Sequence, residues 1–393
     1  MHNSLTTQRI LSIDAFRGIT ILVMIFVNEL AGVQGIPAWM KHMPANADAM
    51  TFVDVVFPAF LFIVGMSIPF AINNRVAKGD NLGQVQLHIL FRTIGLLVLG
   101  VFMVNAEGGY NEQAMALPIA LWSLLFYAGV IIIWNVYSSQ SKTTVYILRG
   151  TGVALLLILA WLYRGGEDGS QTLTPQWWGI LGLIGWAYLA TCIIYQIVRG
   201  NLFGILIMIA VCIGIYGAGK SPSGEASWIA GLGGHATHTA IALCGMAVSL
   251  MFFDQKLKLD QTKRFLVVIV FAAIVFAVGF LLRPYYTISK IYATPTWALY
   301  SAGICTIIFT ILYVIVDLQK INGWTSFFKP AASNPLLTYI IPFIVYAFMQ
   351  LVHIHWPSVF YQGAAGILWS AVYAVLVMTA VTGLNKMKIR LQL

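Results

Sequence analysis

The feature that most constrains this chain is a series of long apolar runs separated by short polar connections. An α-helix that crosses a bilayer needs about 20 mostly apolar residues. Only 9% of the 393 residues are charged, whereas a soluble globular chain carries about 25% charged residues. Twelve apolar runs can be marked, at roughly 18–36, 51–73, 90–106, 115–136, 145–163, 176–198, 202–217, 229–253, 265–282, 295–316, 333–353 and 364–384.

These runs predict an all-α fold, a polytopic membrane helix bundle that forms a single domain over residues 1–393. About twelve transmembrane helices are expected, with ten as the lower limit, because the runs at 90–106 and 202–217 are short. The connections between the runs are short as well. Any chemistry is therefore expected inside the membrane or at its two faces.

The distribution of Lys and Arg predicts the orientation of the bundle. When the connections are assigned alternately to two sides, starting with the N-terminus inside, 17 of the 22 Lys and Arg residues fall on the inner side. Cytoplasmic connections carry an excess of these residues. We therefore expect both termini in the cytoplasm. The outer side keeps Lys41, Arg164, Lys220, Arg283 and Lys290.

Several classes of protein are excluded. The net charge of +9 does not indicate a nucleic-acid partner, because the basic residues are spread thinly and form no stripe. The four cysteines lie inside apolar runs without metal-ligand spacing. His235 and His238 are three positions apart, but no third ligand is evident, so no metal is expected. The chain contains no P-loop, G-x-S-x-G, zinc or dinucleotide-binding motif.

The first predicted span begins with an acidic and a basic residue on one helix face. Asp14 and Arg17 are three positions apart. As structural features they would be an acidic N-terminal cap and a basic anchor at the membrane interface. As a functional feature, Arg17 could bind a phosphate group, because its guanidinium fork matches phosphate oxygens.

Asn28 and Glu29 lie ten or more residues into the first run, where apolar residues are expected. Polar groups at membrane depth are costly and are therefore functional candidates. Asn28 could join two helices or donate a hydrogen bond to a carbonyl oxygen. Glu29 must face the bundle or a cavity if it is ionised.

The predicted outer connection after the first run contains His42. A loop histidine is commonly just solvated, but an imidazole titrates near neutral pH and suits a general base. His42 can meet Asn28 only if the connection folds back or the helix breaks near Gly32 and Gly35.

A second acidic residue, Asp54, lies about one turn into the second run. Three roles stay open for it. It could orient a histidine, pair with Lys290 from another outer connection, or cap the second helix.

The stretches that carry these residues resemble a known family. They are Ser12–Gly18 (SIDAFRG), Val27-Asn28, Lys41-His42, Phe52–Gly65 (FVDVVFPAFLFIVG), Lys290, Val316-Asp317, Lys329-Pro330 and Asn334-Pro335-Leu336. Together they are similar to the heparan-α-glucosaminide N-acetyltransferase family, best over residues 9–70 and 285–345.

This resemblance implies transfer of an acetyl group across a membrane, from cytoplasmic acetyl-CoA to the amine of a glucosamine-type sugar on the far side. The implied catalytic pair is Asn28 and His42. The residues expected to support this pair are Asp54, Lys290 and Glu29. The residues expected at the acetyl-CoA end are Asp14, Arg17 and Asn334.

The resemblance also implies a multi-pass protein of the bacterial inner membrane. Its partners would be acetyl-CoA as cosubstrate, a small amino sugar and membrane lipids, with no metal and no nucleic acid. A homodimer formed through apolar faces of the spans stays open.

Departures from the family keep other functions open. Ser223–Ser227 stands where the family commonly has Asp-Pro-Glu-Gly, and residues 176–217 are expected to be an added helical hairpin. One alternative is a permease for N-acetylglucosamine or a muropeptide sugar, because twelve spans with both ends inside are a common transporter layout. The other alternative is an O-acetyltransferase for a cell-envelope glycan, since the same base would serve a hydroxyl acceptor.

Overall fold

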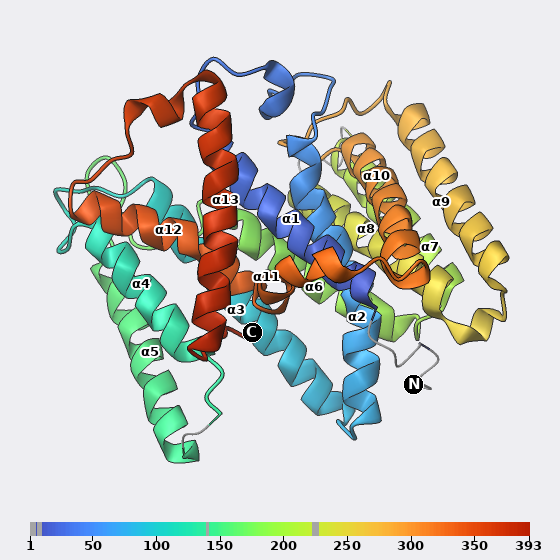
Figure 1. Cartoon of the computed structure of the whole chain (residues 1–393), viewed down its shortest axis with the longest axis horizontal. Coiled ribbons are helices and arrows are strands. Elements are labelled where there is room, and N and C mark those ends of the chain that lie inside the picture. The colour runs from blue at the N-terminus through green and yellow to red at the C-terminus, as the bar shows by residue number, and fades with distance from the viewer. Residues whose placement is uncertain (1–4, 6–9, 139–140, 222–227) are drawn as a thin grey trace.

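The fold is a bundle of apolar helices, seen in a computed structural model that describes residues 5, 10–138, 141–221 and 228–393 (Figure 1). Within these residues, ten helices are long and apolar enough to cross a membrane. They are α1 (Leu11–Leu30), α2 (Val53–Ala77), α3 (Leu82–Glu107), α5 (Lys142–Leu162), α6 (Gly179–Ile197), α7 (Leu202–Gly219), α8 (Trp228–Phe253), α9 (Gln261–Leu282), α10 (Pro295–Tyr313, continued by a π-helical turn to Leu318) and α13 (Gly363–Lys386).

Two shorter apolar helices complete the set of twelve. These are α4 (Ile119–Trp134) and α12 (Pro335–Leu351), and α12 follows the single turn α11 (Lys329–Ser333). Each of the twelve helices overlaps one predicted apolar run. The prediction of an all-α, multi-pass helix bundle is confirmed.

Capping residues explain why some helices are longer than their apolar runs. The side chain of Asn81 accepts a hydrogen bond from the backbone of Gln84, and the side chain of Gln84 accepts one from Asn81. This capping box satisfies otherwise unpaired N–H groups. It starts α3 eight residues before the predicted run at 90–106, so that helix is not short. Asn201 caps α7 more simply, because its side chain accepts a hydrogen bond from the N–H of Gly204.

The first helix lies earlier in the chain than the predicted run at 18–36. It begins at Leu11 because the carboxylate of Asp317, at the end of α10, accepts hydrogen bonds from the N–H groups of Leu11 (3.1 Å) and Ser12 (2.9 Å). A carboxylate is favourable at a helix N-terminus. The helix ends at Leu30, and Gly35 then turns the chain with a φ of +67°.

The connections lie on two opposite faces of the bundle. The inner face, as used below, carries the α2–α3 and α4–α5 connections, and the outer face carries the α1–α2 and α9–α10 connections (Figure 1). Backbone pairs join connections on the same face. The inner pairs are Leu5 with Asp254 and Asn135 with Leu391, and the outer pairs are Gln34 with Gln362 and Tyr110 with Gly165.

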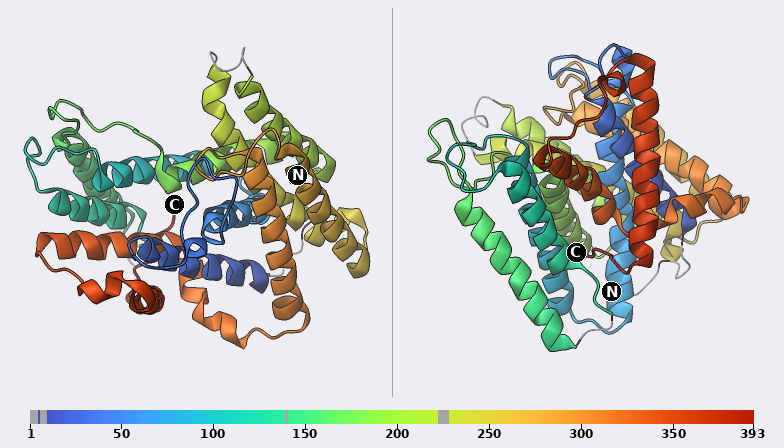
Figure 2. Two further views of the ribbon diagram at one scale, coloured as in Figure 1. Left: turned by 90° about the horizontal axis from the view of Figure 1, so that it is seen from above. Right: turned by 60° about the vertical axis from the view of Figure 1, so that its left-hand side comes forward.

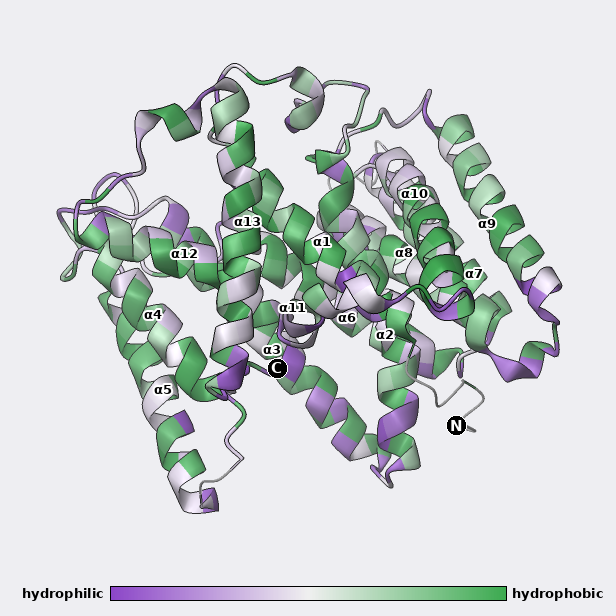
Figure 3. Ribbon diagram, viewed as in Figure 1, coloured by the Kyte–Doolittle hydropathy of each residue, from purple (hydrophilic) through white to green (hydrophobic). Residues whose placement is uncertain are grey.

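This alternation agrees with the predicted topology, in which both ends of the chain lie on one side. Hydrophilic residues gather at helix ends, most clearly at the α2–α3 and α8–α9 connections (Figure 3). That the inner face is cytoplasmic stays a prediction from the Lys and Arg distribution.

The centre of the bundle is formed by α8, whose most apolar window is completely buried. It packs against α2, α6, α7 and α10, while the late helices α12 and α13 fold back against α4 and α1 (Figure 2). The predicted hairpin at 176–217 corresponds to α6 and α7. These helices hardly touch each other, because α6 packs mainly on α3 and α7 on α8.

The contact between α2 and α8 leaves no room for a side chain at two glycines. A Cβ atom on Gly65 would overlap the carbonyl oxygen of Ala242, and one on Gly245 would overlap that of Phe62. Close backbone contact through small residues is a common way to pack membrane helices.

We predict that Gly65→Ala destabilises the protein by about 3 kcal/mol, the upper end for an overpacked core. The measurement is the melting temperature of the purified protein in detergent. Gly214→Ala in α7 is the control, because nothing lies within 4 Å of a Cβ atom there. A Gly65→Ala variant with the same melting temperature as the wild-type protein would contradict the close packing of α2 on α8.

Candidate functional site

The outer end of α2 is organised around the carboxylate of Asp54, whose side chain is only 2% exposed. Its Oδ2 accepts hydrogen bonds from the backbone N–H groups of Thr51 (3.1 Å) and Met43 (3.3 Å). The hydroxyl of Thr51 donates to the carbonyl of Lys41 (2.9 Å). A buried carboxylate must be satisfied by such donors. The segment 41–51 therefore folds back over the start of α2.

This folding places His42 at the second oxygen of Asp54. His42 Nδ1 lies 2.7 Å from Asp54 Oδ1. Because a carboxylate only accepts hydrogen bonds, Nδ1 carries the proton of this bond. In the neutral ring, Nε2 then keeps its lone pair and can accept a proton. The imidazole remains accessible, with 41% of the side chain exposed.

Lys290, from the α9–α10 connection, completes the cluster. Its Nζ lies 3.2 Å from both ring nitrogens of His42. Burial lowers the pKa of Lys290 below its ordinary value, and the charge of Asp54 acts in the opposite direction. The structure thus brings together three residues that the sequence separates by up to 248 positions.

A second set of bonds fixes the segment 41–51 against the α9–α10 connection. Asp48 accepts hydrogen bonds from the N–H of Ile288 (2.8 Å) and from Nε of Arg283 (2.9 Å). The bond from Ile288 is the main reason why the pKa of Asp48 lies below its ordinary value. The hydroxyl of Ser289 donates to the carbonyl of Ala45 (2.7 Å). These bonds hold Lys290 beside His42.

Asn28 and Glu29 lie at the outer end of α1. Asn28 is exposed, and its side chain makes no hydrogen bond with any described residue, His42 included. Glu29 Oε1 accepts hydrogen bonds from Tyr346 (2.5 Å) and Trp369 (3.2 Å). The two neighbours thus have different surroundings.

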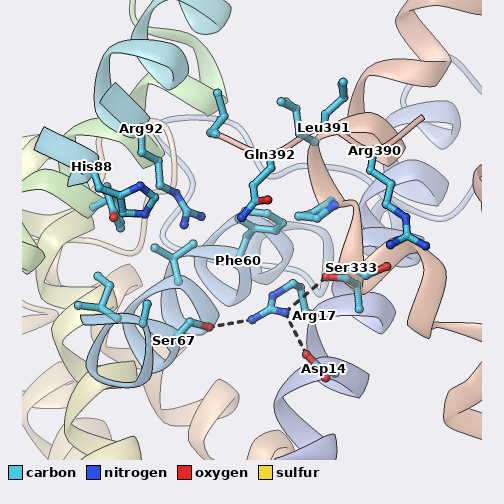
Figure 4. A pocket seen from close by; sticks show the side chains of 18 of the residues that line it. Asp14, Arg17, Phe60, Ser67, His88, Arg92, Ser333, Arg390, Leu391 and Gln392 are labelled. Atoms are coloured by element: carbon cyan, nitrogen blue, oxygen red, sulfur yellow. Dashed lines mark hydrogen bonds and ion pairs between the residues drawn. The ribbon is translucent and has the colours of Figure 1, made fainter. Parts of the chain in front are cut away.

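The inner face contains a cavity of about 620 Å³ between α1, α2, α3, α6 and the C-terminal segment (Figure 4). Arg17 lies in its wall and donates to Asp14 (3.1 Å), to the hydroxyl of Ser67 (2.8 Å) and to the carbonyl of Ala332 (3.4 Å). Asp14 and Arg17, which the sequence predicts at the acetyl-CoA end, both line this cavity.

Three further arginines line the cavity, and the sequence analysis did not single them out. These are Arg75, Arg92 and Arg390. Arg75 is paired with Asp80 (2.9 Å). Arg92 lies over the ring of Tyr188, with its guanidinium carbon 4.8 Å from the ring centre, and its buried Nε has no hydrogen-bond partner. Because Asp14 is the one acidic side chain among the residues that line the cavity, its wall is strongly cationic.

A narrow, largely apolar extension of about 60 Å³ continues from the cavity into the bundle. The two spaces share Phe60 and Arg92 in their walls. The extension reaches Met24 and Tyr339. Since residues four apart lie on the same helix face, Met24 is one turn below Asn28.

Asn334 does not line the cavity and is completely buried. Its side chain donates to Asn385 (2.9 Å) and to the carbonyl of Ile389 (3.1 Å), and it accepts from the N–H of Leu391 (3.1 Å). It thereby holds the C-terminal segment that brings Arg390 to the cavity (Figure 4). Asn334, which the sequence predicts at the acetyl-CoA end, therefore acts on the cavity only through this segment.

Comparison with known proteins identifies the family. The family model described as "Domain of unknown function (DUF5009)" matches residues 9–234, more than half of the chain. The chain belongs to the DUF5009 family. The match includes α1, α2 and the segment with His42, and it also spans the predicted hairpin at 176–217.

Two curated proteins are similar to part of this DUF5009 chain. The heparan-alpha-glucosaminide N-acetyltransferase of Homo sapiens is 34% identical over 97 residues, which are 25% of this chain and 14% of the human protein. The protein of the same name from Mus musculus is 32% identical over 100 residues, with the same coverage. The chain therefore matches about one seventh of the length of these relatives. The resemblance to their family is confirmed.

The remaining sequence-based candidates lie apart from these sites. His238 is buried in α8 between the rings of Phe57 and Trp297. In the parts of the chain that the structure describes, no group of three or more His, Cys, Asp or Glu residues could hold a metal ion. The departure at Ser223–Ser227 lies outside the described residues.

We predict that Asp54→Ala raises the amide hydrogen exchange of Met43 and Thr51 by about 10- to 100-fold. The reason is that each N–H loses a bond to a charged acceptor, which is worth about 1.5–3 kcal/mol. The measurement is hydrogen exchange of the detergent-purified DUF5009 protein. Asp80→Ala on the inner face is the control. Unchanged exchange at Met43 and Thr51 would show that Asp54 does not hold the segment 41–51.

Proposed function

We propose that this protein is an acetyltransferase of the bacterial inner membrane. It takes the acetyl group of acetyl-CoA, bound from the cytoplasm, and transfers it to the amine of a glucosamine-type sugar at the opposite face. One observation carries the proposal. The same helices, α1 and α2, hold the cationic cavity at their inner ends and Asn28 and Asp54 at their outer ends.

The cationic cavity fits the phosphate groups of a coenzyme A molecule. Arg92 and Arg390 form no salt bridge with a described carboxylate, so their guanidinium groups are available for phosphate oxygens. The orphaned Nε of Arg92 is a donor that such an oxygen would satisfy. The apolar extension beyond Arg92 leads toward Met24, the direction that the slender arm ending in the thioester would take.

The helical distances match a reaction near the outer end of the bundle. Arg17 and Asn28 are about 17 Å apart along α1, and Ser67 and Asp54 are about 20 Å apart along α2. The bulky, charged part of acetyl-CoA would therefore stay at the inner face while its arm reaches toward Asn28. The acceptor amine would approach from the outer face, between Asn28 and His42.

The reaction needs one base and one oxyanion donor. The amine nitrogen attacks the carbonyl carbon of the thioester, and the bond from that carbon to sulfur breaks. His42 Nε2 accepts the proton that the nitrogen loses, and the leaving sulfur regains a proton as a thiol. The amide of Asn28 donates a hydrogen bond to the oxygen on which negative charge develops.

Asp54 and Lys290 would position the base rather than react. The bond from His42 Nδ1 to Asp54 fixes the ring and its tautomer. Lys290 Nζ lies 3.2 Å from the ring, where its protonated form would offset part of the negative charge of Asp54. Holding the thioester and the amine in a fixed relative orientation would then contribute to the rate.

We predict that His42→Ala and Asn28→Ala each lower acetyl transfer to glucosamine by about 100-fold or more, the usual effect of removing a general base or an oxyanion donor. The measurement is transfer from labelled acetyl-CoA by purified protein in detergent. Lys220→Ala is the control, because Lys220 is an exposed residue of the outer face that belongs to neither proposed site. Full activity in the His42→Ala variant would contradict the proposed base. If vesicles that contain the protein take up glucosamine and no acetyl group is transferred, the acetyltransferase proposal is wrong and the permease alternative is favoured.

We predict that Arg92→Ala raises the KM for acetyl-CoA by about tenfold with a small change in kcat, because Arg92 would contact the phosphates and not the reacting atoms. The measurement is the same assay with varied acetyl-CoA. Arg149→Ala is the control, since Arg149 is an exposed inner-face arginine on α5 that does not line the cavity. An equal rise in KM for both variants would mean that acetyl-CoA binding depends only on the overall positive charge of the inner face and not on Arg92 in the cavity.

A further inference from the structure

The outer end of α1 also meets a cluster of aromatic side chains that the proposed reaction leaves without a role. We call the carboxylate and these rings the Glu29 cluster. They come from α12, from the α12–α13 connection and from α13. Besides Glu29, its members are Tyr346, Trp356, Phe360, Trp369 and Tyr373.

The rings of the Glu29 cluster pack closely around Trp369. Phe360 is stacked on it with 4.4 Å between ring centres and an angle of 5°, and Trp356 lies 4.8 Å away. Tyr373 lies 6.0 Å from Trp369, and its buried hydroxyl has no hydrogen-bond partner. Tyr346 is exposed, and the other rings except Tyr373 are partly exposed, so part of the aromatic surface beside Glu29 is open to a ligand. Aromatic faces next to a few polar groups are features of a site that binds a polar ring.

The carboxylate of Glu29 has no cationic partner among the described residues. Its hydrogen bonds come from the hydroxyl of Tyr346 and the indole of Trp369, and both go to Oε1. Neither donor carries a charge. Oε2 receives no hydrogen bond from the described residues. A half-buried carboxylate without a counter-charge is costly.

An aromatic belt at the membrane interface would explain the rings but not this carboxylate. A carboxylate surrounded by aromatic faces is instead suited to an ammonium group. The charge would pair with Glu29, and the ring faces would attract the cation through their quadrupoles. Glu29 also adjoins Asn28 in the chain. A ligand held there would lie at the same end of α1 as Asn28, on a neighbouring side of the helix.

We propose that the Glu29 cluster is the acceptor subsite and that it selects an amino sugar in its protonated, ammonium form. This inference rests on the proposed function, because that function places an amine acceptor at the outer face. Glu29 binds the ammonium group, and the aromatic faces pack on the sugar ring. The ammonium nitrogen gives up one proton to His42 before it attacks, and the second proton, lost after the attack, goes to the leaving sulfur. The neutral, acetylated product has no such charge and leaves the subsite more readily.

The first test measures binding to the wild-type protein without acetyl-CoA. Glucosamine, N-acetylglucosamine and glucose are titrated into the detergent-purified full chain, and tryptophan fluorescence is followed, since Trp356 and Trp369 belong to the cluster. Two pH units below the amine pKa of about 8, glucosamine should bind about tenfold more tightly than the two neutral sugars. Above that pKa the preference should disappear. Equal affinity for the three sugars at the lower pH would overturn the proposal.

The second test removes the charge of the subsite with Glu29→Gln. This variant should bind glucosamine as weakly as N-acetylglucosamine. Glu112→Gln is the matched control, because Glu112 is an exposed carboxylate of the outer face, away from the cluster. A Glu29→Gln variant that keeps the preference for glucosamine would overturn the proposal. If this variant does not fold, the proposal is judged by the wild-type protein alone, from its preference for glucosamine over the neutral sugars and the pH dependence of that preference.

Acetyl transfer measured in parallel separates this inference from the proposed function. If transfer occurs while Glu29→Gln leaves glucosamine binding unchanged, the subsite is wrong and the acetyltransferase stands. If glucosamine binding depends on Glu29 but no acetyl group is transferred, the subsite stands and the acetyltransferase is wrong.

Discussion

The outer half of the candidate site depends on the carboxylate of Asp54. This carboxylate lies at the end of a transmembrane helix and is only 2% exposed, so it needs hydrogen-bond donors close by. The chain supplies them by folding the segment 41–51 back onto the helix, where two backbone N–H groups and His42 reach the carboxylate. The position of the histidine is thus a consequence of satisfying a buried charge. Lys290 then reaches the ring because Asp48 fixes the same segment to the α9–α10 connection.

The inner half depends on a different constraint, the concentration of arginines around one cavity. Four arginines line a space that has Asp14 as the one acidic side chain in its wall. Asp14 and Ser67 engage Arg17, while Asn334 holds the C-terminal segment that delivers Arg390. The two halves are joined by α1 and α2, and the apolar extension lies between them. This arrangement favours a substrate that is anionic at one end and reacts at the other.

Much of the fold could be predicted because transmembrane helices must satisfy their own backbone. The twelve apolar runs therefore correspond to twelve helices, and the lysines and arginines predict which connections share a face. The exact span of α1 could not be predicted, because its first turn is capped by Asp317 from more than 300 positions away. Local sequence carries no sign of that contact.

The candidate site was predictable only in part. Asp54, His42 and Lys290 could be singled out as polar residues near the outer ends of spans, and the structure brings them together. Arg92 and Arg390 resemble ordinary inner-face arginines in the sequence, and their common cavity exists only after α3 and the C-terminal segment have packed. Likewise, Glu29 meets Tyr346 and Trp369 across 317 and 340 positions.

The central claim, that donor and acceptor enter from opposite faces, is tested most directly in sealed proteoliposomes. Labelled acetyl-CoA is supplied outside, and glucosamine is placed either inside or outside. The account predicts labelled N-acetylglucosamine only when glucosamine is inside, because the two substrates must reach the site from different sides. Product formed with both substrates outside, and none across the membrane, would contradict it.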